Sequence, residues 1–199
     1  MPKLSIAIPT HNMDNKDFFL KRLLDSIEEQ TFKDYEIVIT EDGKMAENTN
    51  SAIKKANGDL IKIMYMDDYF AHKDALKRIV EGFKGNWLAT GCGHQDNPIL
   101  AWDRPHVPNF DGIPNDINTI GSPSVVTIRN GLDMYFDENM TWLLDVDFYK
   151  RLNAKYGPPD LLDDINVVIG IGPHQMTQQL SDELKANEGK YLKQKHEKN

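Results

Sequence analysis

Short apolar runs alternate with amphipathic segments along the first half of the chain. Four runs have the length and apolar character of buried strands, and these are residues 4–8, 35–39, 60–64 and 87–90. Three segments between them place apolar side chains on one helical face, and these are residues 17–29, 45–56 and 73–83. We expect Asp17 to cap the first helix and Gly58 to follow the end of the second. This alternation predicts an α/β fold with a mostly parallel sheet flanked by helices.

The second half of the chain is less regular. Residues 91–122 contain several prolines, and we expect an irregular connection with room for a short hairpin. A further strand is expected at residues 124–128 and a helix at residues 142–156, which Gly157 and two prolines terminate. The tail, residues 182–199, is rich in Lys and Glu and predicts either a peripheral helix or a frayed end.

These segments fit one compact domain with a small appendage. A chain of 199 residues, of which 40% are hydrophobic, can bury a single core. We expect a domain over residues 1–181, made of halves at 1–91 and 92–181, followed by a charged tail at 182–199.

Two adjacent acids follow the third apolar run. Asp67 and Asp68 cannot continue a buried strand, so they are expected at its carboxyl end. In an open α/β sheet, ligands bind at this edge. Two carboxylates there suit Mg²⁺ or Mn²⁺, which could in turn hold a diphosphate. An exposed acidic pair in a turn is the alternative interpretation of these two residues taken alone.

Composition narrows the classes of partner and location. The formal net charge of −8 disfavours nucleic acid as a partner. Cys92 is the single cysteine, which excludes an internal disulfide and fits a reducing compartment. No apolar run approaches membrane-spanning length, and the N-terminus lacks a signal-peptide pattern. We therefore expect a cytoplasmic protein without a transmembrane segment.

Five segments in series resemble GT-A glycosyltransferases of family 2. They are residues 4–12 (LSIAIPTHN), 24–32 (LDSIEEQTF), 35–43 (YEIVITEDG), 66–68 (MDD) and 136–148 (FDENMTWLLDVDF). The resemblance implies a GT-A, Rossmann-like domain with a nucleotide-binding first half and an acceptor and catalytic second half. It also implies inverting transfer of a sugar from a nucleotide-diphosphate sugar to a glycan or other hydroxyl acceptor, with Mn²⁺ or Mg²⁺. By resemblance alone the preferred donor is a UDP-sugar, with GDP or dTDP as other candidates.

The resemblance assigns nucleotide contacts to the ends of the first two strands. It assigns them to Pro9, Thr10, His11 and Asn12, and to Glu41 and Asp42, with Asp67 on the ribose or a metal-bound water. Asn, Thr and Gly are also frequent in ordinary turns, so both segments could be plain connections.

The metal motif departs from the usual pattern of the family. Met66 stands where the first acid of an Asp-X-Asp motif is expected, and a thioether is a poor ligand for a hard cation. Asp68 is then the expected metal ligand. His174, in a glycine-rich turn, is a second candidate to meet the metal or diphosphate, with an ordinary surface histidine as the alternative.

Asp145 is the candidate catalytic base. Inverting transfer needs a group that takes the proton of the acceptor hydroxyl, and a carboxylate can do so. Leu144 and Asp145 stand where the family has a Glu-Asp pair at a helix start. A charge placed at a helix N-terminus is the structural alternative, and it suits Asp147 equally. Contacts to the donor or acceptor sugar are expected from Trp142, Ser122 and Ser124.

Two other classes of function remain open from the sequence. Met66 and Leu144, each in place of an expected acid, would suit a degenerate module that binds a nucleotide-sugar without turnover. A sugar-phosphate nucleotidyltransferase would share the sheet edge and the metal. It would also require a basic glycine-rich loop after the first strand, where residues 9–12 offer none.

Overall fold

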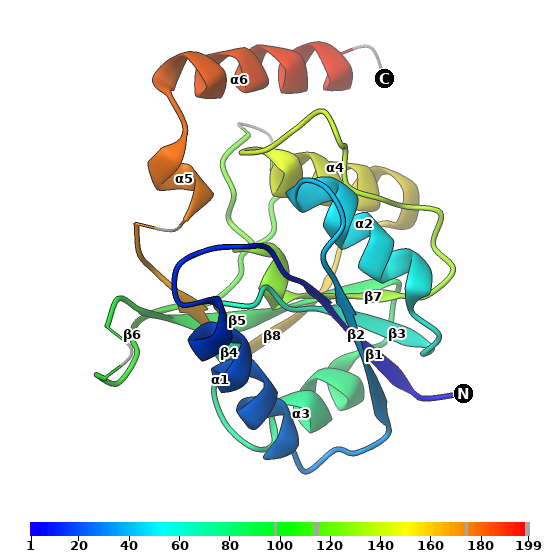
Figure 1. Cartoon of the computed structure of the whole chain (residues 1–199). Coiled ribbons are helices and arrows are strands. Elements are labelled where there is room, and N and C mark those ends of the chain that lie inside the picture. The colour runs from blue at the N-terminus through cyan, green and yellow to red at the C-terminus, as the bar shows by residue number, and fades with distance from the viewer. Residues whose placement is uncertain (98, 114–115, 174, 198–199) are drawn as a thin grey trace.

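A mixed eight-stranded sheet forms the centre of the molecule. The computed structural model describes residues 1–97, 99–113, 116–173 and 175–197. Over these residues the strand order is β2-β1-β3-β7-β5-β8-β4, with β6 paired to β5 (Figure 1). The strands β1, β2, β3, β5 and β8 run in one direction, and the other three run against them. The predicted α/β class and mostly parallel sheet are confirmed.

The first three strands form the parallel half of the sheet. β1 (Leu4–Pro9) lies between β2 (Tyr35–Thr40) and β3 (Leu60–Ile63) and pairs with both in parallel. All residues of β1 and β3 are buried, because helices cover both faces. The apolar runs of the sequence predicted these strands to within about a residue at each end.

The second half adds the antiparallel strands. β5 (Trp87–Gln95) pairs with β7 (Val126–Arg129) on one side and forms the hairpin with β6 (Asp103–His106). The expected strand at 124–128 is instead a short 3-10 turn, Pro123–Val125, followed by β7. Pro123 at the start of that turn fixes a helical φ and cannot donate to the sheet, so pairing begins later.

Two strands were missed by the sequence analysis. β8 (Asp160–Gly170) runs parallel to β5, and its last residues pair with the short β4 (Tyr69–Phe70). The acidic, half-exposed first part of β8 hides the apolar run that follows it. The Asp-Asp turn at residues 67–68 is therefore held between β3 and β4, beside the end of β8.

Helices cover both faces of the sheet. Figure 1 shows α1 and α3 on one face and α2 and α4 on the other, with α6 beyond α4. Their bounds are Lys16–Glu28 for α1, Met45–Lys55 for α2, Ala75–Gly82 for α3, Leu144–Tyr156 for α4, Met176–Gln179 for α5 and Asp182–His196 for α6. None of the helices in the described part of the chain is both long and apolar enough to span a membrane.

Two helix starts differ from the predictions. The residue that precedes α1 is Asn15, in a left-handed conformation with φ 61°, and Asp17 lies inside the first turn rather than at the cap. α4 begins at Leu144, so Trp142 belongs to the preceding loop. The tail is a helix, α6, and buries Glu188 and Leu192, while the domain division at residue 182 stays a prediction.

Gly58 tests the close approach of the turn between α2 and β3 to the central strand β1. A Cβ atom at Gly58 would lie 2.6 Å from the Ser5 nitrogen and 2.7 Å from the Leu4 carbonyl carbon. Because these are backbone atoms of a central strand, Gly58→Ala should lower the free energy of unfolding by about 1 to 3 kcal/mol. Chemical denaturation monitored by circular dichroism measures this loss.

Gly189→Ala is the matched control. It lies within α6, and a Cβ atom there would meet nothing within 4 Å. The change should be neutral or raise the free energy of unfolding by up to about 1 kcal/mol, through helix propensity. Equal effects of the two substitutions would contradict the close-packing explanation.

Candidate active site

A cavity of about 530 Å³ opens where the carboxyl ends of β1 and β3 meet the start of α4. This is the edge at which open α/β sheets bind ligands, because several strand-to-helix loops converge there. Seven of the residues expected from the sequence line it: Pro9, His11, Asp67, Asp68, Ser122, Trp142 and Asp145. The sheet thus brings together residues from both halves of the chain.

Five expected residues do not line the cavity, and these are Thr10, Asn12, Glu41, Asp42 and Ser124. His174 lies outside the described residues. The functional assignments of all these residues stay predictions.

Asn48 of α2 joins the loops after β1 and β2. Its amide donates to the Thr10 carbonyl at 2.7 Å, and its side-chain oxygen accepts from the Asp42 nitrogen at 3.0 Å. Thr10 itself is buried and donates its hydroxyl to the Thr40 carbonyl at 3.0 Å. Thr10 therefore ties the two strands together, and Asn48 is the member of this group that faces the cavity.

The acids after β2 make ion pairs at the surface. Glu41 pairs with Lys16 at 2.6 Å, and Asp42 pairs with Lys55 at 3.0 Å. The Asp42 carboxylate also accepts a hydrogen bond from Ser51, and this bond, with the one from Lys55, lowers the pKa of Asp42. The Asp42 carboxylate is therefore ionised in neutral water.

The acidic pair is held by contacts from distant elements. The Gly170 amide, at the end of β8, donates to the Asp68 carboxylate at 2.9 Å. Arg22 of α1 donates to the Asp67 carbonyl at 2.6 Å. Gly170 also packs against that carbonyl, which would lie only 2.4 Å from a Cβ atom there. These contacts fix the turn that presents both carboxyl groups to the cavity.

Asp68 is a buried carboxyl in a charged environment. Burial, and next the charge of Asp67, raise the pKa of Asp68 well above its usual range. Hydrogen bonds from Ser124 and Gly170 and the charge of Arg22 oppose that rise. A cation bound in the cavity would favour the ionised carboxylate in the same way.

Lys62 lies beneath this site, fully buried. Its ammonium donates to the carbonyls of Ser124 and Val126. Burial lowers the pKa of Lys62 to about 7, an effect that the charge of Asp68 opposes. Ser124 is therefore part of the support beneath the cavity, where it also accepts a hydrogen bond from the Tyr65 amide at 2.8 Å.

The donor set suits a cation that keeps other ligands. Throughout the described ranges, with their gaps at 98, 114–115 and 174, no group of three or more His, Cys, Asp or Glu side chains is placed to hold a metal ion. Mg²⁺ and Mn²⁺ need only one or two carboxylates when phosphates and water complete the shell. Asp68, with Asp67 beside it, fits that requirement but not a metal cage made of protein alone.

Asp145 stands at the first turn of α4, facing the cavity. Its carboxylate accepts from the Asn118 amide at 2.6 Å and from the Val146 nitrogen at 2.7 Å. Burial raises the pKa of Asp145 to about 6, although these hydrogen bonds oppose it. A carboxylate with this pKa is ionised at neutral pH and is a stronger base than an exposed one. Asp147, by contrast, is fully buried in an ion-pair network and does not line the cavity.

Tyr65 stands among the acids of the site. It lines the cavity, and burial raises the pKa of its hydroxyl well above the usual range. The charges of Asp145, Asp68 and Asp67 add to that rise, so all three carboxyl groups lie near one phenol. The acids that the sequence placed 77 or more positions apart therefore share one site.

Sequence reasoning missed Asn48, Asn118 and Tyr65. Asn48 carries a usable signal, since an Asn in an apolar helix face needs a polar partner. Asn118 lies in the irregular region, where no periodicity marks it, and also accepts from the Ile120 and Gly121 amides. Tyr65 follows a strand directly, and only the fold shows that its ring turns into the cavity.

Comparison with known proteins finds sequence similarity to glycosyltransferases in the first half of the chain. Residues 5–90 match the sequence model of Glycosyl transferase family 2. A GalNAc(5)-diNAcBac-PP-undecaprenol beta-1,3-glucosyltransferase of Campylobacter jejuni is 35% identical over 65 residues. That alignment covers 33% of this chain and 20% of the relative, so the chain spans a small part of that protein.

Solved structures share the fold at low sequence identity. TarS of S. aureus superposes with a TM-score of 0.62 and 17% identity, over 86% of this chain and 37% of TarS. A complex of TarS 1–349 with UDP-GlcNAc gives a TM-score of 0.62 and 14% identity, over 90% of this chain and 61% of that one. The mannosyltransferase PcManGT of Pyrobaculum calidifontis, in complex with GDP-Man and Mn²⁺, superposes with a TM-score of 0.55 and 15% identity. The superposition covers 87% of this chain and 58% of PcManGT.

Asp145→Asn tests the raised pKa of this half-buried carboxyl through its effect on stability. The pKa of this group rises from 3.8 to about 6 on folding. As pH increases through that window, the unfolded chain ionises first, so the wild-type free energy of unfolding falls. The variant lacks this loss, and its midpoint of thermal unfolding relative to wild type should rise from pH 4 to pH 6 and then level off.

Glu183→Gln, an exposed change on α6, is the control for this measurement. Its difference from wild type should stay flat across the same pH range. A difference for Asp145→Asn that is equally flat would contradict the raised pKa.

Proposed function

We propose that this chain, which is similar to family 2 GT-A glycosyltransferases, transfers a sugar from a nucleotide-diphosphate sugar to a hydroxyl acceptor with inversion. The observation that carries this proposal is one cavity lined by both the Asp67–Asp68 pair and Asp145. The pair stands at the strand edge that suits a diphosphate, and Asp145 faces the same space from α4. A donor whose diphosphate is held by the acidic pair would thus lie next to Asp145.

Donor binding is proposed for the loops after β1 and β3. Pro9, His11 and Asn48 line the cavity on the side of the nucleotide-binding half, and backbone and amide groups there can meet a base. Asp68, with Asp67, would hold Mg²⁺ or Mn²⁺, which neutralises the diphosphate and helps it to leave. A UDP-sugar is our preferred donor, supported by the TarS complex with UDP-GlcNAc, while the complex of PcManGT supports GDP as the other base.

Asp145 is proposed as the base of the transfer. Its carboxylate takes the proton of the acceptor hydroxyl as that oxygen bonds to the anomeric carbon. The bond from this carbon to the diphosphate oxygen breaks on the opposite face, so the nucleoside diphosphate leaves with the bonding electrons. Asn118, by its hydrogen bond to the Asp145 carboxylate, orients the base.

Ser122 and Trp142 are proposed to contact the sugars. The Ser122 hydroxyl is buried, lines the cavity and has no hydrogen-bond partner among the described residues. A sugar hydroxyl is a partner of the right chemistry for it. Trp142, half-buried in the loop before α4, can place its ring against a sugar face.

A binding module without turnover is the second candidate. Met66 is 1% exposed and Leu144 is 3% exposed, so both residues that replace expected acids are packed into the core. Such a module would bind the donor as described above and leave it intact. The two experiments below separate binding from turnover.

Nucleotide and metal binding should depend on Asp68. UDP at about 100 times its Kd, with Mn²⁺, should raise the free energy of unfolding by about 2.7 kcal/mol. Asp68→Asn should remove the dependence on Mn²⁺, because the amide is a weaker ligand for a hard cation. Thermal unfolding with UDP, GDP and dTDP, each with and without Mn²⁺, measures this. Asp25→Asn, on the exposed face of α1, is the control and should respond as wild type.

Transfer should depend on Asp145. Asp145→Asn should lower kcat by about 10² to 10⁴-fold, because the amide cannot take a proton. The Kd for the nucleoside diphosphate should stay within about twofold of wild type. The rate is measured as release of nucleoside diphosphate while the sugar passes to an acceptor or, slowly, to water.

The rate of transfer should also depend on pH. Wild-type kcat should rise with pH through about 6, the pKa of the base, because only the ionised carboxylate can take the proton. A variant of full rate would overturn the base assignment, and donor binding with no release in wild type would favour the binding module.

A further inference from the structure

α6 contacts the loop that leads into α4. Glu188, in the middle of α6, is 8% exposed, and its carboxylate accepts hydrogen bonds from three consecutive backbone amides. The Thr141 amide donates at 2.7 Å, the Trp142 amide at 2.8 Å and the Leu143 amide at 3.0 Å. A single buried anion therefore orders the backbone on which Trp142 stands.

The loop has little local means to order itself. α4 begins after Leu143, an apolar residue that makes no side-chain cap. Amide groups at a helix start need an acceptor, and Ser, Thr, Asp or Asn usually supply it from the preceding residue. Leu143 offers no such acceptor, and Glu188, 45 positions later, accepts instead from the amides that lead up to α4, ending with that of Leu143. Asp145 follows two residues after Leu143, so the position of the base depends on the same backbone.

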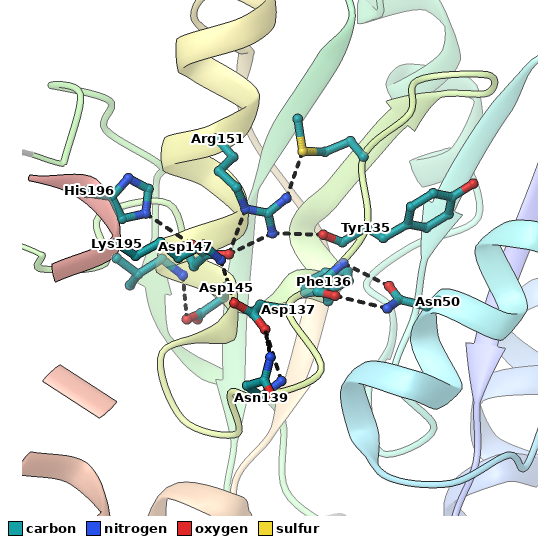
Figure 2. A network of polar contacts seen from close by, with 12 residues as sticks. Asn50, Tyr135, Phe136, Asp137, Asn139, Asp145, Asp147, Arg151, Lys195 and His196 are labelled. Carbon is teal, nitrogen blue, oxygen red and sulfur yellow. Dashed lines mark hydrogen bonds and ion pairs between the residues drawn. The ribbon is translucent and has the colours of Figure 1, made fainter. Parts of the chain in front are cut away.

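A second group of contacts holds the far end of α6. Lys195 pairs with Asp137 at 2.5 Å and with Asp147 at 2.9 Å, and His196 contacts Asp147 at 3.0 Å. Figure 2 shows that these side chains and Arg151 converge on the buried Asp147, next to Asp145 on α4. α6 is therefore attached on both sides of the loop at residues 139–144.

We propose that Glu188 is a positioning residue of this site, holding residues 141–143 so that Trp142 and Asp145 face the cavity. Its catalytic consequence rests on the proposed function, whereas the ordering of the loop does not. No sequence pattern indicates this role, because Glu188 lies in a tail of mixed charge.

Glu188→Gln is the direct test, and Glu183→Gln is its matched control on the exposed face of α6. The amide side chain keeps the size of Glu188 but has one acceptor oxygen in place of two and no charge. Hydrogen exchange, followed by NMR, should speed at least tenfold at the amides of residues 141–143 in Glu188→Gln. The control should stay within twofold of wild type, and circular dichroism should show both variants folded.

The kinetic measurement separates positioning from general stability. Glu188→Gln should lower kcat at least tenfold while the Kd for UDP with Mn²⁺ stays within twofold, because the acidic pair is untouched. Unchanged exchange at residues 141–143, or faster exchange with unchanged kcat, would overturn the proposal. If wild type binds nucleotide but transfers no sugar, the proposed function fails, and faster exchange in Glu188→Gln alone still supports the ordering of the loop.

Discussion

The hydrogen bond from the Gly170 amide to the buried Asp68 carboxylate connects the two halves of this molecule at the site. The two residues are 102 positions apart, with Asp68 in the turn between β3 and β4 and Gly170 at the end of β8. A buried carboxylate needs hydrogen-bond donors from the protein, because burial removes the water molecules that would otherwise solvate it. The bond therefore fixes where the acidic pair lies, and the position of the cavity follows from it.

Other polar side chains around the cavity also form hydrogen bonds to residues far away in the sequence. Asn48 links the loops after β1 and β2, Asn118 orients Asp145, and Glu188 holds the amides before α4. Each is at least partly buried, and each bonds to backbone or to a single carboxylate. Such bonds specify geometry, because a buried polar group left without its partner is costly. The loops that line the cavity are thus held in place by side chains from other parts of the chain.

The apolar pattern predicted the sheet better than it predicted the site. β1, β2 and β3 follow from short runs whose residues are buried in a parallel sheet, and the family resemblance is confirmed by the fold and by residues 5–90. β8 was missed because its first half is acidic and exposed. The start of α4 was placed two residues early, because residues 141–143 form a loop whose amides bond to Glu188 of α6 and not within the helix.

The sequence by itself determined the order of the first strands and helices and the acids that follow those strands, whereas Asp145 became the candidate base through the family resemblance. These are local properties, because the spacing of apolar residues, the turn residues and the charges can each be read from a few neighbouring positions. Only the tertiary structure decided that Asp68 and Asp145 share a cavity, that Thr10 and Ser124 support it from beneath, and that a charged tail helix orders the loop at its rim. Those outcomes depend on pairings between residues tens of positions apart, which no local pattern records.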